Sequence, residues 1–305
     1  MKSNLRKKGP LILSVFLILT GVLIILLPMI LQDWSIKQAT EEYETLKTEV
    51  LSASAESSTE TDLPDSTATD IPPTESEEPE PVDLIDEDKA TETEMPEEEP
   101  KEESPGHSST ATGTSPGTGA NLTACLQKNA DFIAWLKIPG TRINYPVVQS
   151  DDTEYYLTHT FNGTKSKLGC LFSLTKSDYQ TPGKNIAIYG HHITSSGQKM
   201  FRPLIFYKKQ SFYAKHSTVY LDSLYHSETY TIFAVIDMHS DDWDPSTASF
   251  SSDAEFLAFV ERAKEQSLYD TGVEVNADDH ILTLITCDRT YDKQDGRLIV
   301  MAVAQ

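Results

Sequence analysis

Near the C-terminal end of the chain lies the run Ile281-Leu282-Thr283-Leu284-Ile285-Thr286-Cys287-Asp288-Arg289, and a second run, Arg297-Leu298-Ile299-Val300-Met301-Ala302, follows it. The first run alternates β-branched and apolar residues without Gly or Pro, which predicts a strand, and the second predicts another. Cys287 therefore ends one strand and Arg297 begins the next. Strand ends are positions from which a rigid scaffold presents reactive groups, although a lone cysteine is more often a small buried residue.

A pair of histidines follows an earlier apolar run, in the segment Ile188-Tyr189-Gly190-His191-His192. Two surface histidines in a loop, half of a metal site, or an acid or base for Cys287 would each give this pattern. The sequence has no Cys-x-x-Cys and no Cys/His spacing typical of zinc, and no further ligands can be assigned. We therefore expect neither a metal nor another cofactor.

The chain has three cysteines, and the other two are Cys125 and Cys170. Cys125 lies in a predicted amino-terminal helix and Cys170 in a predicted strand, so both are interpreted as structural. A disulfide between them remains an alternative for a domain outside the cell.

The acidic charge is concentrated in one segment. The net charge is -22, and residues 51–103 hold 20 Asp or Glu against two Lys, which gives -18 for that segment. The rest of the chain is close to neutral, so a general charge for binding nucleic acid is absent.

Residues 11–31 form an uncharged apolar run of 21 residues, about 32 Å as a helix, which predicts a transmembrane helix. Four basic residues precede it, at positions 2, 6, 7 and 8, and Asp33 follows. The positive-inside rule then predicts a cytoplasmic tail at residues 1–10 and an extracellular remainder. A cleaved signal peptide is the alternative, but the run is too long for one and no small-x-small cleavage site follows.

Two segments separate this predicted anchor from the next apolar region. Residues 32–51 predict a juxtamembrane helix. Residues 52–119 are rich in Glu, Pro, Ser and Thr and predict a disordered acidic stalk, because they cannot bury enough apolar surface to offset the entropy of ordering. We interpret the stalk as a spacer, with binding of cations or a basic partner as the alternative.

Residues 120–305 predict the folded domain. One or two short helices are expected over residues 122–135, and strands over residues 143–148, 169–172, 185–189, 218–221 and 228–235, before the two strands already described. A helix over residues 253–268 carries a capping box at Ser252 and Glu255. Many short strands with few helices predict a mainly β barrel or sandwich.

These motifs together resemble the sortases, membrane-anchored cysteine transpeptidases of Gram-positive bacteria. The resemblance rests on Thr283-Leu284-Ile285-Thr286-Cys287, on Arg297 downstream, and on Tyr189-Gly190-His191 upstream. The segments at residues 135–141 and 145–149, the second histidine and the long helix before the cysteine strand resemble class B. Ile285 departs from that class, in which a serine is expected. The resemblance implies a closed eight-stranded barrel with amino-terminal helices and a long helix between strands six and seven.

The resemblance also implies a mechanism. Cys287 must ionise to attack an amide. A free thiol has a pKa of about 8.5, so it needs a neighbouring cation to form the thiolate at neutral pH. His191 would protonate the leaving amine. Arg297 cannot be a base but suits a developing oxyanion. Thr286, Ile285 and His192 are expected to contact or orient the substrate. Asp288 is expected in an exposed loop and is not predicted as a third catalytic residue.

Secreted proteins with a C-terminal sorting signal, of LPxTG or NPxTN type, would be the substrates. The acceptor would be an amine of a cell-wall precursor, or a pilin lysine in a pilin-polymerising relative. A surface thiol protease that only hydrolyses, and a non-catalytic surface module, are the competing interpretations.

Overall fold

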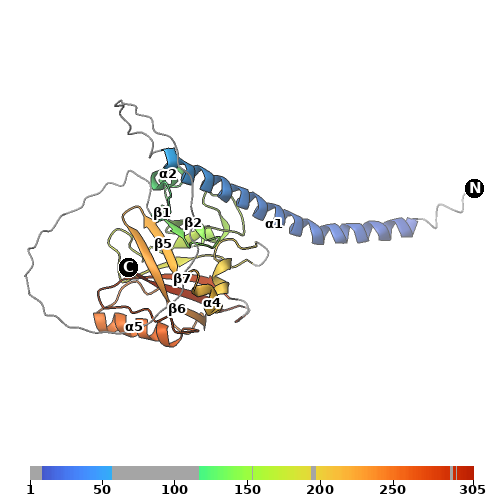
Figure 1. The fold of residues 1–305 in the computed structure, drawn as a ribbon. Coiled ribbons are helices and arrows are strands. Elements are labelled where there is room, and N and C mark those ends of the chain that lie inside the picture. The colour runs from blue at the N-terminus through green and yellow to red at the C-terminus, as the bar shows by residue number, and fades with distance from the viewer. Residues whose placement is uncertain (1–8, 57–116, 153, 194–196, 289–290, 293) are drawn as a thin grey trace, which may run out of the picture. The chain divides into compact units, whose positions relative to one another are not determined.

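The computed structural model describes residues 9–56, 117–152, 154–193, 197–288, 291–292 and 294–305. The predicted disorder of residues 52–119 falls almost wholly outside these ranges, as does most of the predicted tail, residues 1–10. Within the described residues, a long amino-terminal helix, α1 (Gly9–Glu56), is followed by a β-barrel (Figure 1).

Eight strands form a closed barrel in the order β1-β2-β3-β4-β7-β8-β6-β5. The predicted mainly β fold with eight strands is confirmed, and so is the helix between strands six and seven. The strands are β1 Phe132–Lys137, β2 Asn144–Gln149, β3 Leu171–Ser173, β4 Asn185–Tyr189, β5 Thr218–Ser223, β6 Ser227–His239, β7 Ile281–Cys287 and β8 Gly296–Ala304. The further helices are α2 Leu122–Lys128, α3 Tyr155–Thr158, the 3-10 helix η2 Arg202–Lys208, α4 Gln210–Tyr213 and α5 Asp253–Glu265.

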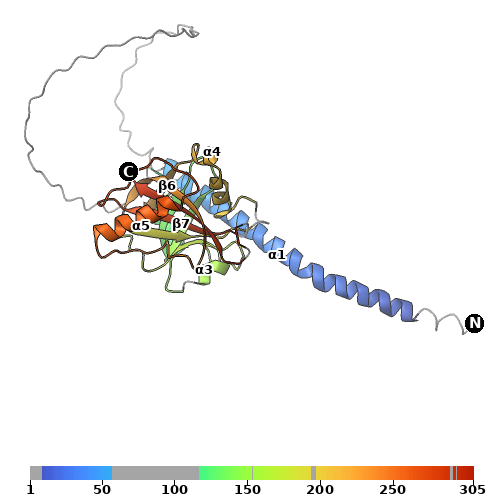
Figure 2. The ribbon, with the colours of Figure 1, turned by 90° about the horizontal axis from the view of Figure 1, so that it is seen from below.

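Alternate residues of the strands face opposite sides of the sheet, as the two-residue period requires. On β7, Leu282 and Leu284 point into the core of the barrel. Ile281 and Ile285 point outward into a second apolar cluster, which also contains Phe256 of α5. Helix α5 therefore covers the outer face of β6 and β7 (Figure 2).

One predicted helix is partly a strand. Helix α2 ends at Lys128, and the chain from Phe132 pairs with both β2 and β5. Ala134, Trp135 and Leu136 are all buried. A short, wholly apolar run has no period that separates helix from strand, so the pairing partners decide the outcome.

Helix α5 begins as predicted and ends three residues early. Ser252 accepts a hydrogen bond from the backbone N–H of Glu255, as its capping position requires. The Glu255 carboxylate accepts from Ser251 rather than from Ser252. At the other end the N–H of Leu268 donates to the carbonyl of Val235, which returns the chain to β6.

Helix α1 joins the predicted membrane span and the predicted juxtamembrane helix in one element. Among the described residues, the stretch Val22–Leu51 is the one helical segment long and apolar enough to cross a membrane. Leu31 and Trp34 are exposed, whereas Tyr43 and Val50 are buried against the barrel. The exposed apolar part therefore precedes the part that packs on protein.

The residues that flank the acidic segment are hydrogen-bonded to each other. The backbone N–H of Asn121 donates to the carbonyl of Val50 at 3.2 Å. Helix α1 therefore contacts the barrel before the acidic segment begins, and the acidic segment itself lies mostly outside the described residues. The composition shows that this segment is polar, but it does not reveal the hydrogen bond between Val50 and Asn121.

Candidate active site

Cys287 and Arg297 lie opposite each other at one end of β7 and β8. Both point to the outer face of the sheet, like Ile285 and Ile299, the next pair along. Cys287 is half-buried and its thiol is free. The guanidinium of Arg297 donates to the carbonyl of Gly296 at 3.0 Å, which holds the head of the side chain beside its own strand.

His191 lies two residues beyond the end of β4, the strand that pairs with β7. β4 and β7 run parallel, with Tyr189 opposite Ile285. The N–H of Gly190 donates to the carbonyl of Ile285 at 3.1 Å, which continues the pairing past the strand end. His191 and Cys287 are each two residues beyond the last pair of this ladder, Tyr189 and Ile285, so a continued register would place them beside each other. A Cβ on Gly190 would lie 2.5 Å from Leu171 and 2.6 Å from Phe201, so only glycine fits there.

The ring of His191 rests in a cradle of backbone. Its Nε2 lies 2.8 Å from the carbonyl oxygen of Leu157. A carbonyl only accepts, so Nε2 carries the proton and Nδ1 is left for chemistry. A Cβ on Gly169, whose φ is +63°, would lie 3.0 Å from Cδ2 of the ring. Sequence reasoning missed Leu157 and Gly169, because neither has reactive chemistry of its own.

Two further predicted residues, Thr286 and His192, form hydrogen bonds that link the ends of β4 and β7. The hydroxyl of Thr286 donates to the carbonyl of Gly190 at 2.7 Å, and Thr286 is 2% exposed. The Nδ1 of His192 lies 2.8 Å from the carbonyl oxygen of Cys287. Both bonds join the β4 end to the β7 end. These positions suit orienting the catalytic segment rather than touching a substrate.

A groove of about 390 Å³ opens on the outer face of the sheet beside Cys287 and Arg297. Tyr189, Ile285 and Arg297 line it together with Met238 at the end of β6. The opposite wall is the β6–α5 connection, which contributes Ser240, Asp241, Trp243, Asp244 and Pro245. Ile285, which the sequence analysis predicts to contact the substrate, is therefore one of the residues that line this groove.

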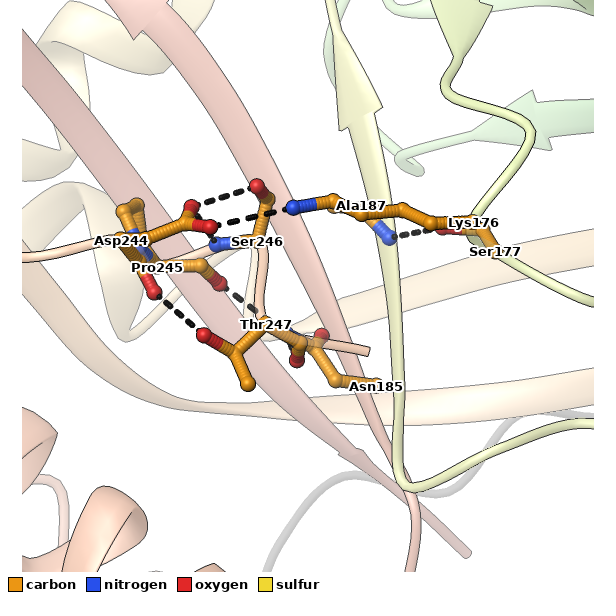
Figure 3. Close-up of polar contacts among 8 residues, drawn as sticks. All are labelled: Lys176, Ser177, Asn185, Ala187, Asp244, Pro245, Ser246 and Thr247. Atoms are coloured by element: carbon orange, nitrogen blue, oxygen red, sulfur yellow. Dashed lines mark hydrogen bonds and ion pairs between the residues drawn. The ribbon is translucent and has the colours of Figure 1, made fainter. Parts of the chain in front are cut away.

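The wall of the groove is fixed to β4 and the segment before it (Figure 3). Lys176 forms an ion pair with Asp244 at 3.1 Å, and the side-chain amide of Asn185 donates to the carbonyls of Pro245 and Thr247 at 3.0 Å. Burial raises the pKa of Asp244, but hydrogen bonds from Ser246 and the Lys176 ammonium outweigh it, so the pKa is lowered. These contacts therefore hold the β6–α5 connection in place, and the connection carries the negative charge of Asp244.

Asp288 is buried, which corrects the prediction of an exposed loop position. Its carboxylate pairs with the ammonium of Lys208, which also contacts Asp237 at 2.6 Å. Burial raises the pKa of Asp237; the ammonium opposes this shift and the Asp288 carboxylate adds to it. Burial alone would lower the pKa of Lys208, but its hydrogen bonds to both carboxylates raise it. An ion cluster of Lys208, Asp237 and Asp288 therefore lies next to the end of β7 that carries Cys287.

The remaining cysteines are unsuited to catalysis. Cys125 and Cys170 are buried, free thiols, so the disulfide that the sequence left open is not formed in this structure. Burial raises the pKa of each to about 12. Among the described residues, His239, Asp292 and Asp295 offer potential metal-ligand atoms within 4.8 Å of one another. Asp292 already accepts hydrogen bonds from the N–H groups of Gln294 and Asp295.

A barrel with this strand order, a half-buried thiol and a cross-strand arginine defines a cysteine transpeptidase domain. The sortase domain family matches residues 136–305, and the chain belongs to the sortase family. It is 34% identical over 176 residues to sortase B of Listeria monocytogenes and 30% identical over 174 residues to sortase B of Staphylococcus aureus. Each match covers 57% of this chain and 70% of the relative.

Solved structures give the same class. The S. aureus sortase B–substrate complex superposes with a TM-score of 0.57 at 29% identity, over 61% of this chain and 84% of that one. A Bacillus anthracis protein similar to sortase B gives 0.55 at 32% identity, over 61% and 82%. The predicted resemblance to class B sortases is confirmed.

Proposed function

We propose that this protein is a membrane-anchored sortase that cleaves a C-terminal sorting signal, LPxTG- or NPxTN-like, and transfers the secreted protein to an amine of the cell wall. One observation carries the proposal: Cys287 and Arg297 are cross-strand partners beside a groove that Arg297 lines, and His191 follows the end of β4, the strand that pairs with β7. Side chains on paired strands are held within narrow geometric limits, which is what catalysis requires.

The chemistry then assigns each group a role. The Cys287 thiolate attacks the threonine carbonyl of the signal, and the new C–S bond pushes charge onto the carbonyl oxygen. Arg297 stabilises that oxyanion. The proton that the Cys287 thiol loses on ionising goes to Nδ1 of His191, and His191 then gives this proton from Nδ1 to the nitrogen of the breaking amide bond, which leaves as an amine. The acceptor amine attacks the thioester, His191 takes back a proton, and Cys287 is released as a thiolate.

The groove supports an extended peptide as substrate. Its floor is apolar at Ile285, Tyr189 and Met238, and it runs along strands toward Arg297. An apolar first residue and a proline of the signal fit such a floor by burial of apolar surface. We propose Ile285 as a substrate-binding residue, and Thr286 and His192 as residues that orient the site.

Helix α1 supports the membrane location. Its exposed apolar side chains end at Leu31 and Trp34, and Gln32, which lies between them, accepts a hydrogen bond from Lys167 of the barrel at 2.7 Å. With basic residues before the span, the amino terminus would be cytoplasmic and the barrel extracellular, close to the membrane surface.

The test uses the full chain in detergent or nanodiscs with LPxTG and NPxTN peptides, with and without oligoglycine or diaminopimelate. A product joined to the added amine supports a sortase, whereas free acid alone would indicate a thiol protease. A pilin peptide as acceptor tests the polymerising alternative. Cys287→Ala should form no thioester by mass spectrometry, and Cys125→Ala should still form one; thioester formation in Cys287→Ala would remove this cysteine from the mechanism.

A further inference from the structure

The second half of helix α1 is part of the core of the barrel domain. Ile36, Ala39, Tyr43, Leu46 and Val50 are at most 7% exposed and recur at three- or four-residue intervals. This spacing places them on one face of the helix. A flexible tether would not bury such a face, so the element that carries the predicted membrane span is built into the folded domain.

Tyr43 makes the most specific contacts of this face. Its hydroxyl donates to the carbonyl of Gly169 at 2.8 Å and accepts from the N–H of Phe161 at 3.2 Å. Its ring packs edge-on against Tyr145, with centroids 5.4 Å apart. Both hydrogen bonds are buried, and each joins residues more than 100 positions apart in sequence.

The contacts of α1 continue along the same loop of the barrel, residues 159–169, which we call the clamped loop. Glu42 accepts from the N–H of Asn162 at 3.2 Å. The carbonyl of Ser35 accepts from Ser166 at 3.4 Å, and Gln32 accepts from Lys167 at 2.7 Å. Four residues of the helix therefore hold this loop through five hydrogen bonds, over about three turns.

The clamped loop ends against the ring of His191. Gly169, which Tyr43 holds by its carbonyl, approaches Cδ2 of the imidazole so closely that a Cβ would lie 3.0 Å away. The next residue, Cys170, donates its N–H to the carbonyl of Tyr156 at 2.9 Å. Tyr156 precedes Leu157, whose carbonyl binds Nε2 of His191. Both walls of the histidine cradle therefore connect to Tyr43.

We propose that Tyr43 is a positioning residue for His191, so that the anchor helix is a working part of the active site. The inference rests on the proposed function only where it concerns turnover. Its physical basis is that the Tyr43 hydroxyl is the buried group that fixes Gly169 and Phe161 together, and a small displacement of an acid from the reacting atoms lowers its efficiency steeply.

The experiment compares Tyr43→Phe with the wild-type full chain in nanodiscs. The phenylalanine keeps the packing and removes both hydrogen bonds. We expect kcat to fall by about 10- to 100-fold with little change in KM, because the acid is misplaced while the groove is intact. The pH profile of kcat and the ring resonances of His191, assigned with His191→Gln, should both change.

Two controls separate positioning from stability. Val50→Ala on the same buried face should lower the melting temperature at least as much, yet keep kcat and the His191 resonances, because the bonds to the clamped loop remain. Thr48→Ala on the exposed face should change none of these. Wild-type kcat and unchanged His191 resonances in Tyr43→Phe would overturn the inference. If the wild type itself transfers no peptide, the proposed function fails, and the resonances alone still decide the role of Tyr43.

Discussion

Cys287 and Arg297 are direct cross-strand partners, one closing β7 and the other following the first residue of β8. Their relation is fixed by the ladder between two buried strands rather than by a loop. Directly opposed residues on one face have Cβ atoms about 5 Å apart. A guanidinium carried on the side chain opposite the thiol suits the oxygen of a group that the thiol attacks.

The first prediction concerns the shape of this cation. Arg297→Lys keeps the charge but removes the planar fork of donors. We expect kcat to fall by about 100- to 1,000-fold, as when an oxyanion donor is lost elsewhere. Arg202→Lys, on helix η2, is the matched control and should leave transfer unchanged. A fully active Arg297→Lys enzyme would show that charge alone suffices.

A second prediction concerns Thr286. Thr286→Val removes the hydroxyl that donates to Gly190 while keeping the shape of the side chain. The carbonyl left behind is half-buried, so the free energy of unfolding should fall by about 1 kcal/mol, the lower end for an acceptor that loses its partner. Because the bond also aligns His191 with Cys287, kcat should fall as well. Thr286→Ser should restore both values in urea unfolding and peptide-transfer assays; failure of that rescue would show that the hydroxyl is not the cause.

The ion cluster of Lys208, Asp237 and Asp288 gives a third prediction. Lys208→Met leaves Asp237 and the fully buried Asp288 facing each other without the ammonium. Removing one partner of a buried pair costs about 3–5 kcal/mol, and the exposure of Lys208 places this case at the lower end. The double variant Lys208→Met with Asp237→Asn should regain part of that loss in equilibrium unfolding. Equal stability of Lys208→Met and wild type would mean that the cluster contributes nothing.

The pair of His280 and Glu228 predicts a pH dependence of stability. Their side chains lie 2.9 Å apart, and the hydrogen bond that His280 donates to the Glu228 carboxylate raises the pKa of His280 above its ordinary 6.5. Burial would raise the pKa of Glu228, but hydrogen bonds from His280 and Tyr230 lower it below 4.5. The histidine term is fully present below 6.5 and is lost as the pH rises through its higher folded pKa. The glutamate term is present above 4.5 and is lost in acid.

The pair therefore stabilises most between these two values. Glu228→Gln should lower the melting temperature more at pH 5.5 than at pH 8.5, measured by calorimetry in one ionic strength. Glu274→Gln, whose carboxylate is largely exposed, is the control and should show little dependence. An equal loss at both pH values would mean that the charge of His280 is not involved.

Local pattern was sufficient for part of this site. The β7 run, Cys287 at its end and Arg297 beyond it were readable because strand period and residue chemistry coincide. His191 was readable because it follows a strand and a glycine. The residues that hold these groups were not: Gly169 and Leu157 act through backbone atoms, and Tyr43 lies 126 positions from its partner.

The errors have the same physical origin. Asp288 looked exposed because its neighbours are polar, but Lys208 compensates its charge from a distant helix. Nor does the composition of the acidic segment reveal that Val50 and Asn121, the residues that flank it, are hydrogen-bonded. Tertiary contacts decide both cases, and a single sequence does not contain their partners' positions.

The last prediction concerns specificity and rests on Ile285. This side chain lies on the groove floor, where class B sortases are expected to carry serine, and it is 5% exposed. An apolar floor should favour leucine over asparagine at the start of the signal. We expect Ile285→Ser to lower kcat/KM for an LPxTG peptide by about 10-fold or more, the cost of lost apolar contact, with a smaller effect on NPxTN.

The matched control is Ile299→Ala, because Ile299 is the cross-strand partner of Ile285 in the same apolar cluster but is not among the residues that line the groove. It should lower stability by a comparable amount, about 2–5 kcal/mol for a buried isoleucine. The ratio of the two kcat/KM values should stay at its wild-type value in this control and change in Ile285→Ser. An unchanged ratio in both variants would place the recognition of the first signal residue elsewhere in the groove, on the wall formed by Trp243 and Asp244.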